Sequence, residues 1–185
     1  MPTAVAIDKP FELERNERQL WAGAPRQGLV FRPSDALMLP FSVLWAGFAV
    51  IWEASALRGG APGFFALWGI PFVLFGLYFT VGRFFGDAWR RTRTAYALTN
   101  ERIIIRSATS MKSLNLRTLS DVTLTERADG SGTITFGPNP FPPWMTGGMQ
   151  WPGIAQAPSF ELIPSARQVY AQIRDAQRAS TTRAD

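Results

Sequence analysis

Few ionisable side chains in this sequence of 185 residues have a spacing that suits chemistry. Cysteine and histidine are both absent, which excludes a thiol nucleophile, a zinc site of nitrogen and sulfur ligands, and a triad with a histidine base. Glu53 is the main candidate, because it is the only acid within a long apolar stretch, and carboxylates inside a membrane often bind protons or ions. Its position near Arg58 also favours a simple ion pair at a membrane surface.

No second group converges on Glu53 in the sequence. Asp87 precedes Arg90 and Arg91 by three and four residues, the spacing of ion pairs on the surface of a helix. The glycine-containing stretches "GGAPG" and "GPNPFPPW" lack the lysine that grips phosphate in a nucleotide-binding loop. We therefore expect a protein that is not an enzyme, with no catalytic residue, no metal and no cofactor.

Several arginines lie close together in the sequence after the long apolar stretch. We define a basic seam of six arginines, namely Arg83, Arg90, Arg91, Arg93, Arg102 and Arg106. The net charge of +5 is compatible with nucleic acid or with an anionic membrane surface as the partner. Because a long apolar segment directly precedes the seam, a membrane explains it without a further partner. The sequence predicts contact with anionic lipid headgroups and no nucleic acid.

Two apolar runs, residues 36–57 and 61–82, precede the seam and predict helices. At about 1.5 Å per residue, some twenty residues cross a hydrocarbon core of roughly 30 Å. The second run contains no charged residue and no polar stripe of helical period, which disfavours the alternative of a buried hairpin in a soluble protein. We therefore predict two transmembrane helices within residues 34–87, after a cytoplasmic N-terminal segment, residues 1–33.

The flanks of these runs predict the orientation in the membrane. Arginines cluster before the first run and after the second, whereas the turn between the runs contains only Arg58. Arginine-rich flanks stay in the cytoplasm. We therefore expect a multi-pass protein of a bacterial inner membrane with both termini in the cytoplasm.

After Arg93, apolar residues recur at every second position, which is typical of strands. Short runs such as "TAYALT", "RIIIRS" and "TITFG" alternate, and Asn100 and Glu101 suit a hairpin turn between the first two. A final strand is predicted at 159–163, before an amphipathic helix in "PSARQVYAQIRDAQ". Residues 88–178 thus predict a cytoplasmic domain of antiparallel strands in a barrel or a sandwich, with the helix covering an open end, followed by a disordered tail, residues 179–185.

A loop rich in proline, glycine and tryptophan, residues 137–158, interrupts the predicted domain. It contains six prolines, four glycines and two tryptophans, a composition that fits no regular element. Long loops of this kind are often functional or disordered. The candidate interaction residues in this loop are Trp144, Met145, Met149 and Trp151. Packing of the same tryptophans on the domain itself is the alternative.

The hairpin "YALTNERIIIRS", Tyr96–Ser107, after two apolar helices resembles bacterial membrane proteins with a pleckstrin-homology-like (bPH) domain. Taken loosely, the resemblance extends from Leu20 to Gln177. It implies a bent barrel of seven strands capped by one helix, and it implies no catalytic motif.

Two functions from different classes remain open. The first is a non-enzymatic membrane protein whose cytoplasmic domain is an interaction module for anionic headgroups, a protein partner or a second copy of the chain. The second is a membrane enzyme or a transporter accessory subunit that uses a carboxylate such as Glu53.

Overall fold

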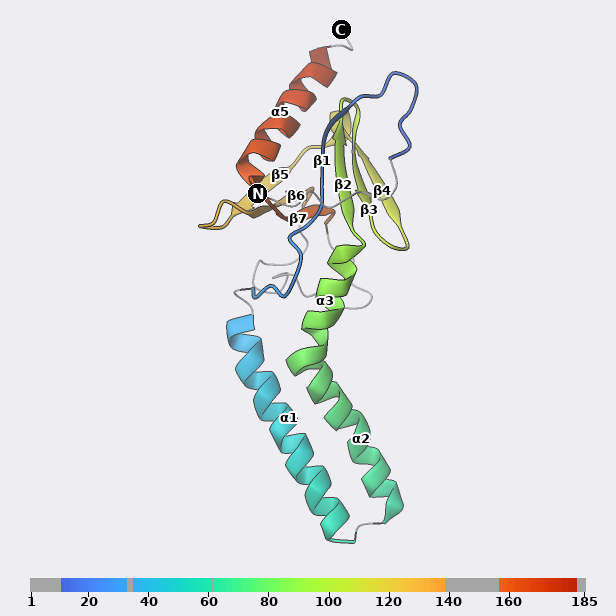
Figure 1. Ribbon diagram of the computed structural model, residues 1–185, viewed down its shortest axis with the longest axis vertical. Helices are drawn as coiled ribbons and strands as arrows, with labels where there is room; N and C mark the ends of the chain where they lie inside the picture. The colour runs from blue at the N-terminus through green and yellow to red at the C-terminus, as the bar shows by residue number, and fades with distance from the viewer. Residues whose placement is uncertain (1–10, 33–34, 61, 139–156, 183–185) are drawn as a thin grey trace. The chain divides into compact units, whose positions relative to one another are not determined.

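The computed structural model of the protein describes residues 11–32, 35–60, 62–138 and 157–182. These residues form two compact units. The described residues between 29 and 89 make up a helical unit, and those in 11–28, 90–138 and 157–182 make up a strand unit. The chain therefore begins in the strand unit, leaves it for the helical unit, and returns, as the colours of Figure 1 show.

Two long apolar helices dominate the helical unit and run antiparallel in Figure 1. α1 spans Asp35–Arg58, and α2 spans Gly63–Leu77. The second helix continues through one π-helical turn, Tyr78–Gly82, into α3, Arg83–Thr92. The acid at the start of α1 and the arginine at its end have the charges that the helix dipole favours there. Both predicted helices are confirmed, and the second is longer than predicted.

A close approach of the two helices defines the hairpin. A β-carbon on Gly76 of α2 would lie 2.9 Å from both the Cα and the Cβ atom of Ala46 on α1, so there is no room for a side chain here. Seven residues earlier on α2, Gly69 leaves space that the side chain of Glu53 on α1 occupies. Because seven residues are about two helical turns, both contacts lie on the same side of α2, along the line where the two antiparallel helices meet.

The described residues of the strand unit form seven antiparallel strands in two sheets. The first sheet has the order β1-β2-β3-β4, with β1 at Gln19–Gly23, β2 at Ala95–Thr99, β3 at Arg102–Arg106 and β4 at Met111–Asn115. The second has the order β5-β6-β7, with β5 at Val122–Glu126, β6 at Gly132–Phe136 and β7 at Ser159–Ile163. The predicted antiparallel strands are confirmed. Within the described residues the sheets do not join into a closed barrel, so that part of the prediction is not confirmed.

β1 is the strand that the sequence did not predict. It lies in residues 1–33, which we assigned to a segment ahead of the helices. Trp21 of β1 pairs with Leu98 of β2, and Gly23 pairs with Tyr96. The Trp21 ring also packs 5.5 Å from the ring of Phe160 on β7. The strand unit thus includes a piece of chain from each side of the helical hairpin.

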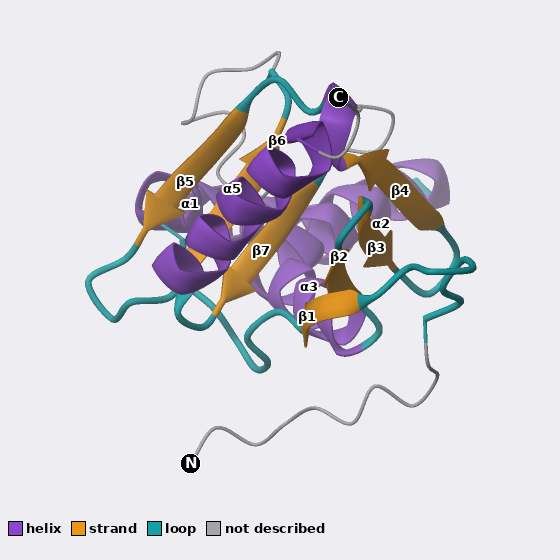
Figure 2. Cartoon of the chain, turned by 90° about the horizontal axis from the view of Figure 1, so that it is seen from above, coloured by secondary structure: helices purple, strands orange, loops and turns teal. Residues whose placement is uncertain are grey.

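One face of each sheet and one face of the terminal helix α5, Ala166–Thr182, form the core of the strand unit. Figure 2 shows α5 lying over the second sheet. The ring of Phe160 packs against those of Tyr96 and Phe136, with centroids 4.7 Å and 5.0 Å apart. The apolar face of α5 is buried at Ala166, Val169, Ile173 and Ala176. α5 includes residues 179–182, which we had assigned to a disordered tail, whereas 183–185 lie outside the described residues.

The helix contact at Gly76 generates a stability prediction. Gly76→Ala adds a methyl group against the backbone of α1, and overpacking of this kind costs about 1–3 kcal/mol. We expect a lower midpoint of thermal unfolding, measured by circular dichroism on the full chain in detergent. Gly47→Ala is the matched control, because apart from the adjoining residues and backbone of its own helix, no atom lies within 4 Å of its added carbon. An equal effect of both substitutions would contradict the close contact.

Candidate functional site

The arginines of the basic seam have different surroundings. Arg83 lies in the helical unit, where its Nη2 atom is 2.9 Å from the Oδ1 atom of Asp35 at the start of α1. Beside it, Arg32 Nη2 is 3.4 Å from Asp87 Oδ2 on α3. All four side chains are largely enclosed. Two neighbouring ion pairs therefore join the start of α1 to α3, and their charges cancel.

Arg91 is a buried arginine, with only 2% of its surface exposed. Its Nη2 group donates a 2.6 Å hydrogen bond to the carbonyl oxygen of Gly28. The side chain of Gln27 in turn donates to the carbonyl oxygen of Arg91, at 3.2 Å. Arg91 thus joins the segment after β1 to the end of α3, so its guanidinium is part of the packed structure.

Arg102 is held by two carboxylates from the segment before β1. Its Nε and Nη2 groups each donate a 2.9 Å hydrogen bond to Glu17, and Nη1 lies 2.9 Å from Glu14 Oε1. The Glu17 side chain is fully enclosed, and it also accepts hydrogen bonds from the Thr99 hydroxyl at 2.7 Å and the Glu14 backbone N–H at 2.8 Å. We call these side chains the Glu17–Arg102 network.

In the Glu17–Arg102 network, hydrogen bonds and the arginine charge together affect the pKa of Glu17 more than burial does. Burial of Glu17 alone would raise its pKa, but the bonds from Arg102, the Glu14 N–H and Thr99, with the charge of Arg102, lower the pKa below its usual value. The hydrogen bond to Glu17 likewise raises the pKa of Arg102. Both groups are therefore charged at neutral pH, and the charge of Arg102 is compensated within the chain.

The other three arginines of the seam lie nearer the surface. Arg106 stacks on Phe11, with its guanidinium carbon 4.6 Å from the ring centre. Phe11 in turn covers Ile104 and Ala97, on the face of the first sheet opposite the main core. Arg90 is half-buried at the end of α3, and Arg93, just beyond it, is exposed. The seam is therefore a set of separate contacts, with its most exposed side chain at Arg93.

The acidic partners of the seam were missed by sequence reasoning. Glu14, Glu17 and Asp35 lie far along the chain from the arginines that they pair with. The charge alternation in "FELERNER" was a signal that acids and bases of this segment take part in ion pairs, although it did not identify the partner. The loop candidates Trp144, Met145, Met149 and Trp151 lie outside the described residues.

Glu53 occupies an unusual position in the helix hairpin. Its Oε2 atom is enclosed and, among the described residues, has no hydrogen-bond donor. The nearby Gly69 provides the space for this carboxylate. No group of three acidic side chains gathers as a metal site would require in the part of the chain that the structure describes. Glu53 is thus a single carboxylate rather than a member of a converging set.

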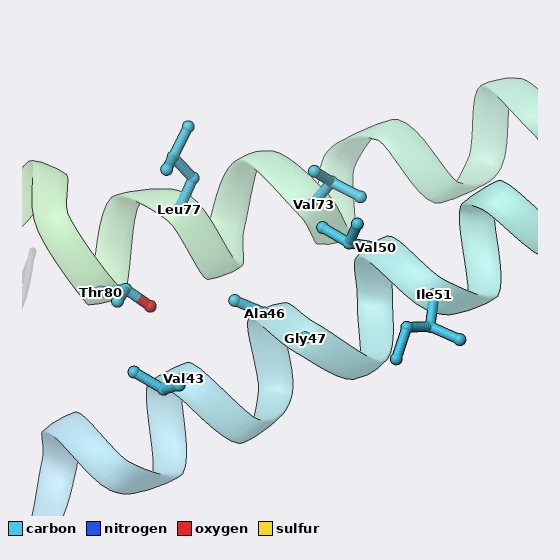
Figure 3. A pocket seen from close by; sticks show the side chains of 8 residues that line it. All are labelled: Val43, Ala46, Gly47, Val50, Ile51, Val73, Leu77 and Thr80. Carbon is cyan, nitrogen blue, oxygen red and sulfur yellow. The ribbon is translucent and has the colours of Figure 1, made fainter.

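A shallow apolar groove also lies along the hairpin. It has a volume of about 600 Å³, and Figure 3 shows its lining side chains, among them Val43 and Val50 of α1 and Val73 and Leu77 of α2. Thr80 is the one polar residue of the lining, and its hydroxyl donates to the carbonyl oxygen of Gly76. The groove therefore presents hydrocarbon, with no polar group directed at a ligand.

Comparisons of the chain with protein-family models, with curated proteins and with solved structures give no match.

The Glu17–Arg102 network predicts a pH-dependent contribution to stability. Because the pKa of Glu17 is lower in the folded protein than its usual 4.5, the contribution is present above pH 4.5 and is lost as the pH falls through the folded value. At neutral pH, Glu17→Gln removes one partner of an enclosed ion pair, and we expect a loss of about 2–4 kcal/mol. The gap to the wild type should close in acid, as measured by thermal unfolding of the full chain.

Glu126→Gln is the matched control for this prediction. Glu126 pairs with Arg167 at 2.7 Å, but the arginine side chain is 81% exposed. Surface pairs of this kind contribute less than about 1 kcal/mol. A Glu17→Gln variant that unfolds like the control at every pH would contradict the role assigned to the network.

Proposed function

We propose that the chain is an integral protein of a bacterial inner membrane, with α1 and α2 as its membrane-spanning helices. One observation carries the proposal: the apolar surface of the hairpin is exposed. Both helices are long and apolar enough to cross a membrane, yet only 17% and 12% of their most apolar stretches are buried. A core helix of a soluble protein buries its apolar face. Apolar surface of this extent in water would drive aggregation, whereas lipid solvates it.

The ends of the hairpin support an orientation with both termini in the cytoplasm. Arginines precede α1 and follow α2, and Arg58 is the single arginine at the opposite end. The orientation rule counts arginines in short flanks and gives acids little weight. The ion pairs of Arg32 and Arg83 therefore leave the expected orientation unchanged.

The strand unit is, in this proposal, a non-enzymatic interaction module of the pleckstrin-homology-like type. The resemblance of "YALTNERIIIRS" to bPH proteins implies seven strands and a terminal helix. Seven described strands in sheets of four and three, followed by the amphipathic α5, agree with that number and order. The absence of a closed barrel among the described residues is the point of difference.

Anionic headgroups are the partner that the chain itself best supports. Arg90 and Arg93 directly follow the second helix of the hairpin, and Arg93 is exposed. Each basic residue near an anionic surface contributes about 1 kcal/mol. The side chains of Arg83, Arg91 and Arg102 are more enclosed than that of Arg93 and contribute less to such a surface. A protein partner or a second copy of the chain is the alternative for this module.

A membrane enzyme or transporter accessory subunit that uses Glu53 is the second candidate. The observation that favours it is the enclosed Oε2 atom without a donor among the described residues. An enclosed carboxylate oxygen without a donor at an apolar helix contact costs stability, so a role outside packing would explain it. It ranks second because no group of three acidic side chains gathers, as a metal site would require, in the described part of the chain.

Topology reporters test the membrane assignment. Alkaline phosphatase inserted in the turn after Gly59 should be active outside the cytoplasm, and green fluorescent protein fused to the C-terminus should fluoresce inside. The phosphatase inserted instead at Ser110, in an exposed turn of the strand unit, should be inactive. The full chain should also stay in the membrane fraction after alkaline extraction. Release into the supernatant, or an inactive phosphatase after Gly59, would contradict the proposal.

Lipid retention tests the headgroup contact. The full chain is purified in mild detergent, and its bound phospholipids are counted by mass spectrometry. Replacing both Arg90 and Arg93 by glutamine should lower the anionic fraction severalfold, because about 1 kcal/mol per residue is lost. Replacing Arg167 and Arg174 on α5 is the control and should leave the fraction unchanged. If both double variants retain the same lipids, a protein partner becomes the preferred reading of the module.

A further inference from the structure

An exposed apolar ridge continues along the second helix beyond the end of its apolar run. Val81, Phe85 and Trp89 recur every four residues, which places them on one face of the helix, and Tyr78 precedes them in the π-helical turn. Tyr78 is 56% exposed, Phe85 62% and Trp89 59%. The sequence ended this span at Gly82, because Arg83 is the first charge, but the ridge extends about two turns further.

The ridge continues past Arg83 because the charged side chains at the start of α3 are paired within the helical unit. Arg83 and Asp87 are directed to the start of α1, where they pair with Asp35 and Arg32. The Arg83 guanidinium carbon also lies 4.6 Å from the ring centre of Phe84. The charges of α3 in this region are thus cancelled within the helical unit, on a different side from the Phe85 ring. An electroneutral, aromatic helix surface results.

We propose that the first two turns of α3 lie in the interfacial region of the bilayer, where the ridge contacts lipid at the boundary between acyl chains and headgroups. The inference rests on the proposed function, because it requires that α2 spans the membrane. It places the membrane boundary of the second span near Trp89 and Arg90, rather than at Gly82.

Three features select lipid as the occupant of the ridge. The ridge is continuous with the exposed apolar surface of α2, such as Leu74 and Leu77, which the proposed span places in lipid. Tyrosine and tryptophan are the side chains that concentrate at membrane interfaces, since their rings are apolar and their tips polar. Arg90 and Arg93 then follow at the level where long basic side chains reach headgroups.

Helix length agrees with this depth. The twenty residues from Gly63 to Gly82 extend about 30 Å, the thickness of the hydrocarbon core. The next seven residues, to Trp89, add about 10 Å, which is on the order of one headgroup layer for a tilted helix. A membrane boundary at Trp89 therefore places every side chain of the ridge in contact with lipid, whereas a boundary at Gly82 would leave Phe85 and Trp89 in water.

Single cysteines test the inference in the full chain, because the protein has none of its own. Nitroxide labels are placed by Leu74→Cys, Phe85→Cys, Trp89→Cys and Thr109→Cys in protein reconstituted in phosphatidylethanolamine–phosphatidylglycerol vesicles. Collision rates with oxygen, which partitions into lipid, and with a water-soluble nickel chelate report depth. Leu74 reports the span, and Thr109, in an exposed turn of the strand unit, reports water. We expect labels at 85 and 89 to have oxygen-to-nickel ratios between these two references.

The outcomes separate failure of this inference from failure of the proposed span. If labels at 85 and 89 match Thr109 while Leu74 is in lipid, the interfacial position is wrong and the span stands. If Leu74 also matches Thr109, the span itself is wrong. If 85 and 89 are protected from both reagents, protein covers the ridge and the inference is overturned. Thermal unfolding of each labelled variant confirms folding, and two ridge positions give independent readings.

Discussion

Pairing of arginine with a carboxylate from a distant part of the chain is the interaction on which this structure depends. Asp35 and Arg83 join the start of α1 to α3, and Glu17 and Arg102 join the segment before β1 to β3. In each pair an enclosed charge has a partner at hydrogen-bonding distance, which is the condition under which buried charges are tolerated. Charge compensation therefore organises both units, although the two are built from different elements.

Compensation also changes how the basic character of the chain is understood. By sequence, the seam is a continuous band of positive charge. By structure, Arg83 and Arg102 are neutralised, Arg91 is packed inside, and Arg106 lies on an aromatic ring. The six arginine charges of the seam, counted alone, therefore overstate the field that this region presents to a partner. The aromatic ridge of α3 is the complement of this effect, because cancelled charge leaves apolar surface as the dominant feature there.

Features with a local physical cause were predictable from the sequence. The long apolar runs specified two helices, and alternation in "TAYALT" and "RIIIRS" specified β2 and β3. α3 was missed because its first residue is charged, and the partner that cancels this charge lies far away in the sequence. β1 was missed because "QLWAG" is short and pairs with a strand on the other side of the hairpin. Ile104 lies between Arg102 and Arg106 on one side of β3, and it is buried there because Phe11 covers it. Long-range contacts decide all three cases.

The placement of β1 has a consequence for the order of events during synthesis. β1 leaves the ribosome before the helical hairpin, whereas its partner β2 follows the hairpin. The first sheet can pair only after both apolar helices have been made, although domains commonly fold in the order of their synthesis. Completion of the strand unit therefore waits until the hairpin has been synthesised. The first sheet therefore assembles only in chains in which both helices have been synthesised. A chain whose synthesis stops within the helices leaves β1 without its partner β2.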